Sequence, residues 1–435
     1  MKYIKSVISL ILIVFLFSGC SMRMASSIDD LISPISPFGD NADVQTAMDN
    51  FVKNGYSLKT PNSGEYIASY NFYDIDNDGE EEAFTFYEPS DNLGSIDLAI
   101  IKKVNNVWTV VENINGDGKD IYSIDFKDLN GDSKKEILVC WDAISNSSNH
   151  VLSVYAYNIK ENVIKLLKID DSITINNYIT VDIDRDNVLE LMLFEINISS
   201  SSRVKAELYS LKNNLFKLLG ETRLDSNITT YTDIKIEDAE NDIRIYADGL
   251  GADGNSMTTE VIYWSNGYDT IVSPFYSYSS GRTRDTTRNA LVVSQDINND
   301  KLIEIPTDKS LKGLPKGVQA IDWKIYKKTT LIHVDYSLLV QDDNYFVTIP
   351  NKLINEIKVA YNEKDRLLTV TNKSNKNMIF SIMPVLKATY DQSKYEGYSI
   401  ILENSGYYYL AKSGNDKDIE ITTDDLKTYI KSIER

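Results

Sequence analysis

Four segments of the chain repeat one acidic pattern: Asp at positions 1 and 5, Asp or Asn at position 3, Glu at position 9, and then an apolar run. These first, second, third and last acidic loops start at residues 74, 128, 182 and 296, so their starts are 54, 54 and 114 residues apart. The last interval is about two periods. At the place of the missing copy, residues 238–246 keep acids at positions 1, 3 and 5 but have Tyr246 at position 9. One structural unit is therefore repeated about five times between residues 50 and 330.

Segments typical of β-strands flank each loop. Around the third loop, residues 178–181 precede it and residues 191–194 follow it, and two further runs come next, at 203–211 and 215–222. Runs rich in Val, Ile, Tyr and Phe that are bounded by Asn, Asp, Ser and Gly predict strands. Four strands in about 55 residues form the unit of a β-propeller blade. We therefore expect a mainly β fold, a β-propeller of about five four-stranded blades over residues 44–334, whose closure would hide most sheet edges.

The acidic loops contain the ligands that Ca²⁺ prefers, which are six to eight oxygens in a flexible cage. Acids at positions 1, 3 and 5 of a tight turn converge on one point, the carbonyl of position 7 adds a ligand, and the glutamate of position 9 closes the cage. An EF-hand differs because it places its glutamate at position 12 between two helices. We expect up to four structural Ca²⁺ ions, held by Asp74, Asp76, Asp78, Glu80 and Glu82; Asp128, Asn130, Asp132, Lys134 and Glu136; Asp182, Asp184, Asp186, Val188 and Glu190; and Asp296, Asn298, Asp300, Leu302 and Glu304.

The turn residue at position 6 distinguishes the loops from one another. Only the first loop has glycine there, Gly79, and Asn187 of the third loop adopts a left-handed turn readily, whereas Ser133 and Lys301 do so less easily. We therefore expect the first and third loops to be the stronger calcium sites. We expect the degenerate copy at 238–246 to keep the fold without the ion. The alternative is that all the loops are solvated acidic turns, since Asp and Asn favour turns without any metal.

The N-terminus has the pattern of a secretory signal. Lys2 and Lys5 precede an apolar run at residues 7–17, and the small residues Ser18 and Gly19 stand directly before Cys20. A basic head, a short apolar stretch and a small-residue cleavage point predict export, with residues 1–19 as the signal peptide. Residues 16–20 resemble the bacterial lipobox, which implies acylation of Cys20 and a lipid anchor on the extracellular face of the cell membrane. The alternative is an ordinary signal peptide with an incidental cysteine.

Cys140, in an apolar run, is expected to be a buried free thiol.

The four loops resemble FG-GAP/VCBS repeats, the calcium-bearing blades of the integrin α-subunit N-terminal propeller and of many bacterial surface proteins. The wider layout is similar to VCBS-repeat lipoproteins of Firmicutes: a lipobox, a Pro-containing linker within residues 20–43 and a short helix expected at 44–53. The resemblance covers roughly residues 20–345. It implies a calcium-bearing propeller that acts in binding or adhesion.

Charge and composition narrow the classes of function. The net charge of −19 argues against nucleic acid and against anionic lipid, and it favours cations, basic partners or neutral glycans. Two distant histidines, His150 and His333, and no reactive cysteine leave little material for nucleophilic triads or zinc sites. We therefore expect a non-catalytic module that binds an extracellular protein or glycan. The alternatives are a secreted carbohydrate-active hydrolase or lyase, which needs two convergent carboxylates, and a solute-binding lipoprotein, whose two α/β lobes do not fit the repeat.

Two regions lie outside the repeat pattern. Residues 335–435 lack the acidic loop and predict a small α+β domain, with a helix start at Thr423 followed by acids. Residues 275–288 gather aromatic side chains and arginines, which suits recognition of a glycan or a carboxylate. The favoured alternative is an inter-blade loop whose arginines balance nearby acids. The candidate ligand residues of this loop are Phe275, Tyr276, Tyr278, Arg282, Arg284 and Arg288.

Overall fold

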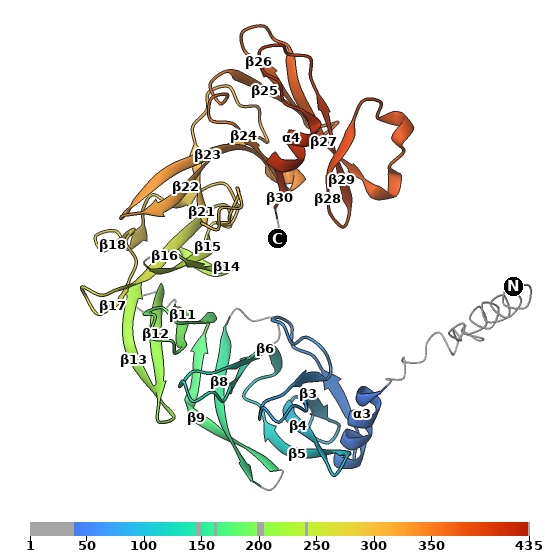
Figure 1. Ribbon diagram of the computed structural model, residues 1–435, viewed down its shortest axis with the longest axis vertical. Coiled ribbons are helices and arrows are strands. Elements are labelled where there is room, and N and C mark those ends of the chain that lie inside the picture. The colour runs from blue at the N-terminus through green and yellow to red at the C-terminus, as the bar shows by residue number, and fades with distance from the viewer. Residues whose placement is uncertain (1–38, 145–148, 161–162, 198–203, 240–241, 434–435) are drawn as a thin grey trace, which may run out of the picture.

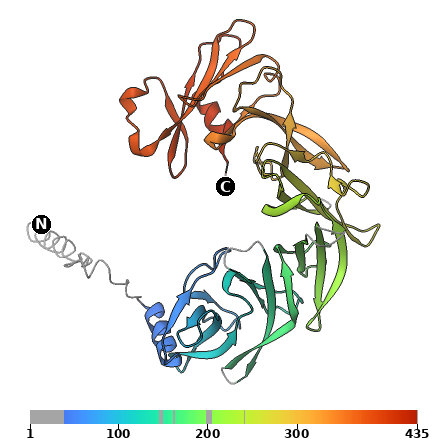
Figure 2. The same ribbon diagram turned by 180° about the vertical axis from the view of Figure 1, so that it is seen from behind.

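The computed structural model describes residues 39–144, 149–160, 163–197, 204–239 and 242–433. The expectation of a mainly β protein is confirmed, with 54% strand and 7% helix. Six antiparallel sheets of four or five strands follow one another along the chain in an open arc, and β18 and β19 form a further two-stranded sheet (Figure 1). Figure 2 shows the same arc from behind, with the N-terminal and C-terminal sheets at its two ends. The structure therefore shows stacked sheets without the closed ring that the sequence led us to expect.

The first sheet has the strand order β1-β3-β4-β5, and a short strand, β2, also pairs with β3. Its strands are β1 (Tyr56–Lys59), β2 (Asn71–Tyr73), β3 (Glu82–Pro89), β4 (Asp97–Val104) and β5 (Val107–Asn115). The turn between β4 and β5 consists of Asn105 and Asn106, both in the left-handed region with φ of 51° and 67°. Two such residues match the twist of the flanking strands, which makes this a tight hairpin.

The next three sheets are built on four-stranded meanders, and the last of them has a fifth, short strand. The second sheet contains β6 (Asp120–Lys127), β7 (Glu136–Asp142), β8 (His150–Lys160) and β9 (Val163–Ile175). The third contains β10 (Asn177–Val181), β11 (Glu190–Ile196), β12 (Val204–Lys212) and β13 (Leu215–Arg223). The fourth contains β14 (Ile228–Asp238), β15 (Ile243–Gly251), β16 (Met257–Ser265) and β17 (Thr270–Val272), and β20 (Thr287–Arg288) pairs with β16.

The fifth and sixth sheets form the C-terminal end of the arc. The fifth has the order β21 (Glu304–Lys309), β22 (Gln319–Lys327), β23 (Thr330–Val340), β24 (Tyr345–Ile349) and β30 (Ile430–Ser432). The sixth has the order β25 (Ile357–Asn362), β26 (Leu367–Asn372), β27 (Met378–Leu386), β29 (Tyr407–Ser413) and β28 (Ser399–Glu403). Residue 334, after which we expected a domain boundary, lies inside β23. The fifth sheet also includes β30 from the C-terminal end of the chain, which pairs with β24.

The second strand of the second sheet, β7, is buried on both faces, because neighbouring sheets stack on either side of it. On β7, Ile137, Val139 and Trp141 pack toward the first sheet, whereas Leu138 and Cys140 pack toward the third. This alternation follows from the two-residue period of a strand. Cys140 is a buried free thiol, as expected.

The helix α3 (Asp40–Phe51) covers the outer face of the first sheet (Figure 1). Its buried residues Val44, Ala47 and Met48 pack on the face that includes Ala99 and Ile101. In a closed ring, that face of the first sheet would have to pack against the last blade. The helix occupies this position instead, which gives a physical reason for the open arc. The helix begins four residues before the expected 44–53.

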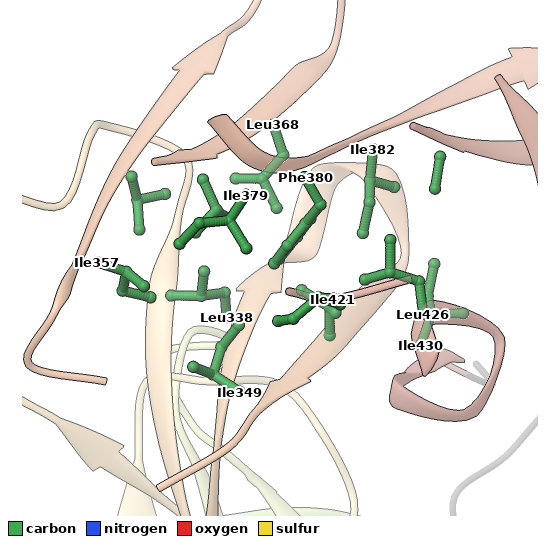
Figure 3. Close-up of a cluster of buried hydrophobic side chains, with 14 of the residues drawn as sticks. Leu338, Ile349, Ile357, Leu368, Ile379, Phe380, Ile382, Ile421, Leu426 and Ile430 are labelled. Carbon is green, nitrogen blue, oxygen red and sulfur yellow. The ribbon is translucent and has the colours of Figure 1, made fainter. Parts of the chain in front are cut away.

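The fifth and sixth sheets share the largest apolar core of the molecule (Figure 3). Leu338 and Ile349 of the fifth sheet pack on Leu368 and Phe380 of the sixth. The helix α4 (Thr423–Tyr429) adds Leu426 to this core. Thr422 begins α4 with a capping box, in which its hydroxyl and the carboxylate of Asp425 accept each other's backbone N–H groups.

Candidate cation-binding loops

The position-9 glutamate anchors each acidic loop to the strand that follows it. Glu82, Glu136, Glu190 and Glu304 are the first residues of β3, β7, β11 and β21, and all four are buried. In every loop one carboxylate oxygen accepts a hydrogen bond from the backbone N–H of position 2, at 2.9–3.1 Å. The glutamate therefore closes the loop at its base and holds its other oxygen close to the acids of the turn.

The aspartates at positions 1 and 5 hold the turn itself. The position-1 carboxylate accepts the N–H of position 6 at 2.9–3.0 Å in all four loops. The position-5 carboxylate accepts the N–H of position 7 at 2.8–2.9 Å, and these position-7 residues are Glu80, Lys134, Val188 and Leu302. Position 6 is left-handed throughout, with φ of 89° at Gly79 and 69°, 70° and 70° at Ser133, Asn187 and Lys301. We expected Ser133 and Lys301 to adopt a left-handed turn less easily, but both residues adopt it in the structure.

In the first loop three carboxylates surround an ammonium group. Nζ of Lys102, from β4, lies 2.6 Å from Oδ2 of Asp76, 2.7 Å from Oδ2 of Asp78 and 2.6 Å from Oε1 of Glu82. Burial alone would lower the pKa of Lys102, but its hydrogen bonds to Asp76, Asp78 and Glu82 raise it, so the side chain stays charged. The hydrogen bond from Lys102 lowers the pKa of Asp78. The oxygens of this loop therefore converge on one cation.

The second loop contains a small cavity instead of a cation. The cavity has a volume of about 130 Å³, and its lining includes Asn130, Asp132, Glu136 and Ala156. Nδ2 of Asn130 donates to Oε1 of Glu136 at 2.8 Å. Burial raises the pKa of Glu136 to about 7, and Asp132 adds to the effect. A buried carboxylate without a cation is thus driven toward its neutral form.

The third loop gathers carboxylates that have no side-chain cation beside them among the described residues. Oxygens of Asp182, Asp184 and Glu190 lie within 4.8 Å of one another, an arrangement that could hold a metal ion, as do oxygens of Asp74, Asp76 and Asp78 in the first loop. Burial raises the pKa of Glu190 to about 8, and the charges of Asp184 and Asp186 push it the same way. The buried hydroxyl of Ser210, on β12, has no hydrogen-bond partner. Carboxylates and an unpartnered hydroxyl are both oxygen ligands for Ca²⁺.

The last loop repeats the arrangement of the second. Nδ2 of Asn298 donates to Asp300 at 3.1 Å and to Glu304 at 3.3 Å. Burial raises the pKa of Glu304 to about 7. Lys431 reaches this loop, but it donates to the backbone carbonyl of Asp296, so it leaves the carboxylates unpaired.

The degenerate copy in the fourth sheet is neutralised by arginines. Arg185 pairs with Asp238 at 2.5 Å, and Arg244 pairs with Asp242 at 2.8 Å and with the buried Glu237 at 3.0 Å. Tyr246, which replaces the position-9 glutamate, is buried. Residue 240 lies outside the described residues.

Two of the six candidate ligand residues at 275–288 are part of the interior. Phe275 belongs to the apolar cluster between the fourth and fifth sheets. The side chain of Arg288 is 0% exposed and pairs with Asp248 at 2.7 Å. It also donates to the carbonyl of Val292. These two residues position the loop and are not accessible to a ligand.

The other candidates of this loop lie nearer the surface. Arg282 pairs with the buried Asp225 at 2.7 Å. Tyr276 and Tyr278 pack edge to face, and Tyr278 and Arg284 are exposed. Strands β18 (Tyr276–Ser277) and β19 (Arg282–Thr283) form a small hairpin that supports them. For Arg282 and Arg288 the structure thus matches the interpretation that the arginines balance nearby acids.

The signal segment and Cys20 lie outside the described residues. Within the residues that the structure describes, no helix is long and apolar enough to span a bilayer.

Comparisons with known proteins yield no family. No family model matches the sequence, and no curated protein matches it. The crystal structure of Chaetomium thermophilum Sqt1 has 8% sequence identity and a TM-score of 0.33, over 72% of this chain and 77% of that chain. The crystal structure of the exotype rhamnogalacturonan lyase YesX has 12% identity and a TM-score of 0.24, over 74% and 71%. Likenesses this weak carry no argument about function.

Proposed function

We propose that this protein is a lipid-anchored, extracellular, calcium-binding repeat protein whose blade-like sheets form a non-catalytic binding or adhesion module for a protein or a glycan. Cys20 would carry the anchor, and the second, third and last acidic loops would bind structural Ca²⁺. The resemblance of the loops to FG-GAP/VCBS repeats supports this assignment, as do the lipobox-like residues 16–20 and the net charge of −19.

The observation that carries the calcium assignment is the ammonium group of Lys102, which pairs with the carboxylates of the first loop. The four loops share one framework of backbone hydrogen bonds, and in the first of them the carboxylates converge on an ammonium group at 2.6–2.7 Å. Within the described residues, no Lys, Arg or His forms an ion pair with the acids of the second, third or last loop. A framework shaped for a cation, with buried carboxylates and no cation of its own, favours binding from solution.

Calcium bound in these loops would stabilise the folded state of the protein. The second and third loops connect two neighbouring strands of one sheet, and each position-9 glutamate is buried at the start of a strand. A ligand that binds only the folded state stabilises that state by mass action. The ion would therefore stiffen the edge of each sheet and hold the arc in one shape, on which a partner could be recognised.

Thermal unfolding in millimolar Ca²⁺, in millimolar Mg²⁺ and in EDTA tests the calcium assignment. We expect a higher midpoint in Ca²⁺ than in EDTA, and little effect of Mg²⁺, because Mg²⁺ demands octahedral geometry and retains its waters. The variant Glu190→Gln should lose part of the shift, and Glu396→Gln, an exposed position on the sixth-sheet side of the molecule, should keep all of it. Equal midpoints in Ca²⁺ and EDTA would contradict the assignment.

A glycan array and a panel of extracellular-matrix proteins, each probed in Ca²⁺ and in EDTA, test the binding module. The expected result is saturable binding that weakens in EDTA. Turnover of a glycan that is lost on changing one carboxylate would instead identify an enzyme.

A further inference from the structure

One residue outside the acidic pattern differs between the loops. The pairing of Ala83 with Ile101 places Lys102 opposite the position-9 glutamate of the first loop. In the second sheet, Ile137 pairs with Tyr155, which places Ala156 opposite Glu136. In the third sheet, Leu191 pairs with Tyr209, which places Ser210 opposite Glu190. Residues directly opposite on neighbouring strands have Cβ atoms about 4.5–5.5 Å apart. At this opposite-strand position, Lys102 and Ala156 lie beside the acids of their loops, and the register gives Ser210 the equivalent place in the third sheet. In the last loop the residue opposite Glu304 is Ile325.

The three side chains at the opposite-strand position leave three different environments. Lys102 is 6% exposed and bonds to three carboxylates of its loop. Ala156 is too short to reach its loop, and a cavity of about 130 Å³ remains beside Asp132 and Glu136. Ser210 offers a buried hydroxyl without a partner. The position that the ammonium group takes in the first sheet thus has no side-chain cation in the second and third.

We propose that Lys102 is a built-in cation that replaces calcium in the first acidic loop, so that the protein binds calcium in its second, third and last loops only. This inference rests on the calcium function proposed for those three loops. A Ca²⁺ ion entering the first loop would have to displace a buried ammonium group from three charge-assisted hydrogen bonds, or share the site with a like charge. The first sheet therefore keeps its structure at low calcium, and the sheets that follow it depend on the ion.

Native mass spectrometry of the full chain across a Ca²⁺ titration tests this proposal by counting bound ions. We expect three ions on the unaltered protein. The variant Lys102→Ser, which copies the third sheet, should bind one more ion, and Ser210→Lys, which copies the first, should bind one fewer.

Asp76→Asn is the matched control, because it changes a first-loop acid and leaves Lys102 in place. The number of ions bound by this variant should equal that of the unaltered protein. A loss of one ion in Asp76→Asn would show that the first loop binds calcium in spite of Lys102, and would overturn the proposal, even where Lys102→Ser does not fold. An unaltered protein that binds no ion, together with one ion on Lys102→Ser, would overturn the calcium function of the other loops and uphold the role of Lys102.

Discussion

The first and third acidic loops have the same backbone framework but opposite electrostatics. In each, the position-1 aspartate holds the turn and the buried glutamate holds position 2. In the first loop, Lys102 pairs with three carboxylates and lowers the pKa of Asp78, although burial still raises the pKa of Glu82. In the third loop, burial and neighbouring acids raise the pKa of Asp184 and that of Glu190. One loop has a side-chain cation among its carboxylates, and within the described residues the other has none.

This contrast shows that the acidic pattern alone does not determine which groups pair with its carboxylates. The pattern brings the oxygens together, and in the first loop a residue of the neighbouring strand, Lys102, supplies the positive charge. In the degenerate copy, Arg185 and Arg244 pair with Asp238 and Asp242. If the calcium proposal holds, a lysine or an arginine can replace the ion while the sheet keeps its strand order.

The largest expected effect comes from removing the built-in cation. Lys102→Ser in EDTA should lower the free energy of unfolding of the first sheet by about 3–5 kcal/mol, because buried carboxylates lose their partner. Urea denaturation followed by the fluorescence of Trp108, which lies in this sheet, measures the loss. Lys59, on β1 of the same sheet, is 36% exposed, is paired with Glu88 at 2.9 Å and serves as the matched control. Lys59→Ser should cost less than about 1 kcal/mol, and equal losses would contradict the difference between the loops.

A second comparison changes the position-1 aspartate of each loop. Asp74→Ala and Asp182→Ala remove equivalent hydrogen bonds to position 6, so each should cost about 1 kcal/mol in EDTA. Saturating calcium should stabilise each occupied site by about 2.7 kcal/mol at a hundredfold excess over Kd. Only Asp182→Ala should lose this increment, which urea denaturation in Ca²⁺ and in EDTA measures. A loss of calcium stabilisation in Asp74→Ala would contradict the role of Lys102.

A third prediction concerns pH in the absence of calcium. Burial raises the pKa of Glu190 from 4.5 to about 8, so the folded protein binds one more proton than the unfolded chain between these values. The free energy of unfolding should therefore fall as pH rises from 4.5 to 8, by an amount on the order of 4 kcal/mol. Calcium should flatten this dependence because the ion replaces the proton.

Urea denaturation of the unaltered protein and of Glu190→Gln, from pH 5 to 8.5 in EDTA, measures this slope. The variant should show a shallower decline than the unaltered protein. Stability that rises with pH over this range, or an identical slope in the variant, would rule out a buried protonated Glu190.

The smallest expected effect concerns the degenerate copy. The pair of Arg185 and Asp238 is exposed, with side-chain exposures of 43% and 78%. Arg185→Ala should therefore cost less than about 1 kcal/mol. Arg244→Ala should cost about 2–3 kcal/mol, because Glu237 is only 1% exposed and loses a charged hydrogen bond. Thermal unfolding of the two variants compares them, and a larger loss in Arg185→Ala would contradict the assignment of Arg244 as the buried cation of this copy.

The acidic pattern and the strand composition were sufficient to predict the repeating β-structure. Each position-9 glutamate directly precedes an apolar run in the sequence, and the structure has each of them at the start of a strand. The hydroxyl of Thr423 and the acids after it likewise indicated a helix start, and the structure places the capping residue one position earlier, at Thr422. These features are local, so a single sequence contains their signals.

The features that could not be predicted depend on register and on contacts between distant segments. Lys102 is 20 residues from Glu82 in the sequence, and only the pairing of β3 with β4 brings it to the first loop. The burial of Arg288 depends on Asp248, 40 residues away. The open arc depends on α3 covering the first sheet, and the helical residues 44–48 do not reveal which face they will cover. A search for a basic residue on the strand that follows each position-9 glutamate, at the place opposite that glutamate, is the signal that would have found Lys102.

A crystal structure of the protein grown in calcium, with anomalous difference maps to locate the ion, tests the central claim most directly. We expect density for Ca²⁺ between Asp182, Asp184 and Glu190 of the third loop. In the first loop we expect Nζ of Lys102 in contact with Asp76, Asp78 and Glu82, without an ion. Calcium in the first loop with Lys102 displaced, or an empty third loop at saturating calcium, would contradict the claim.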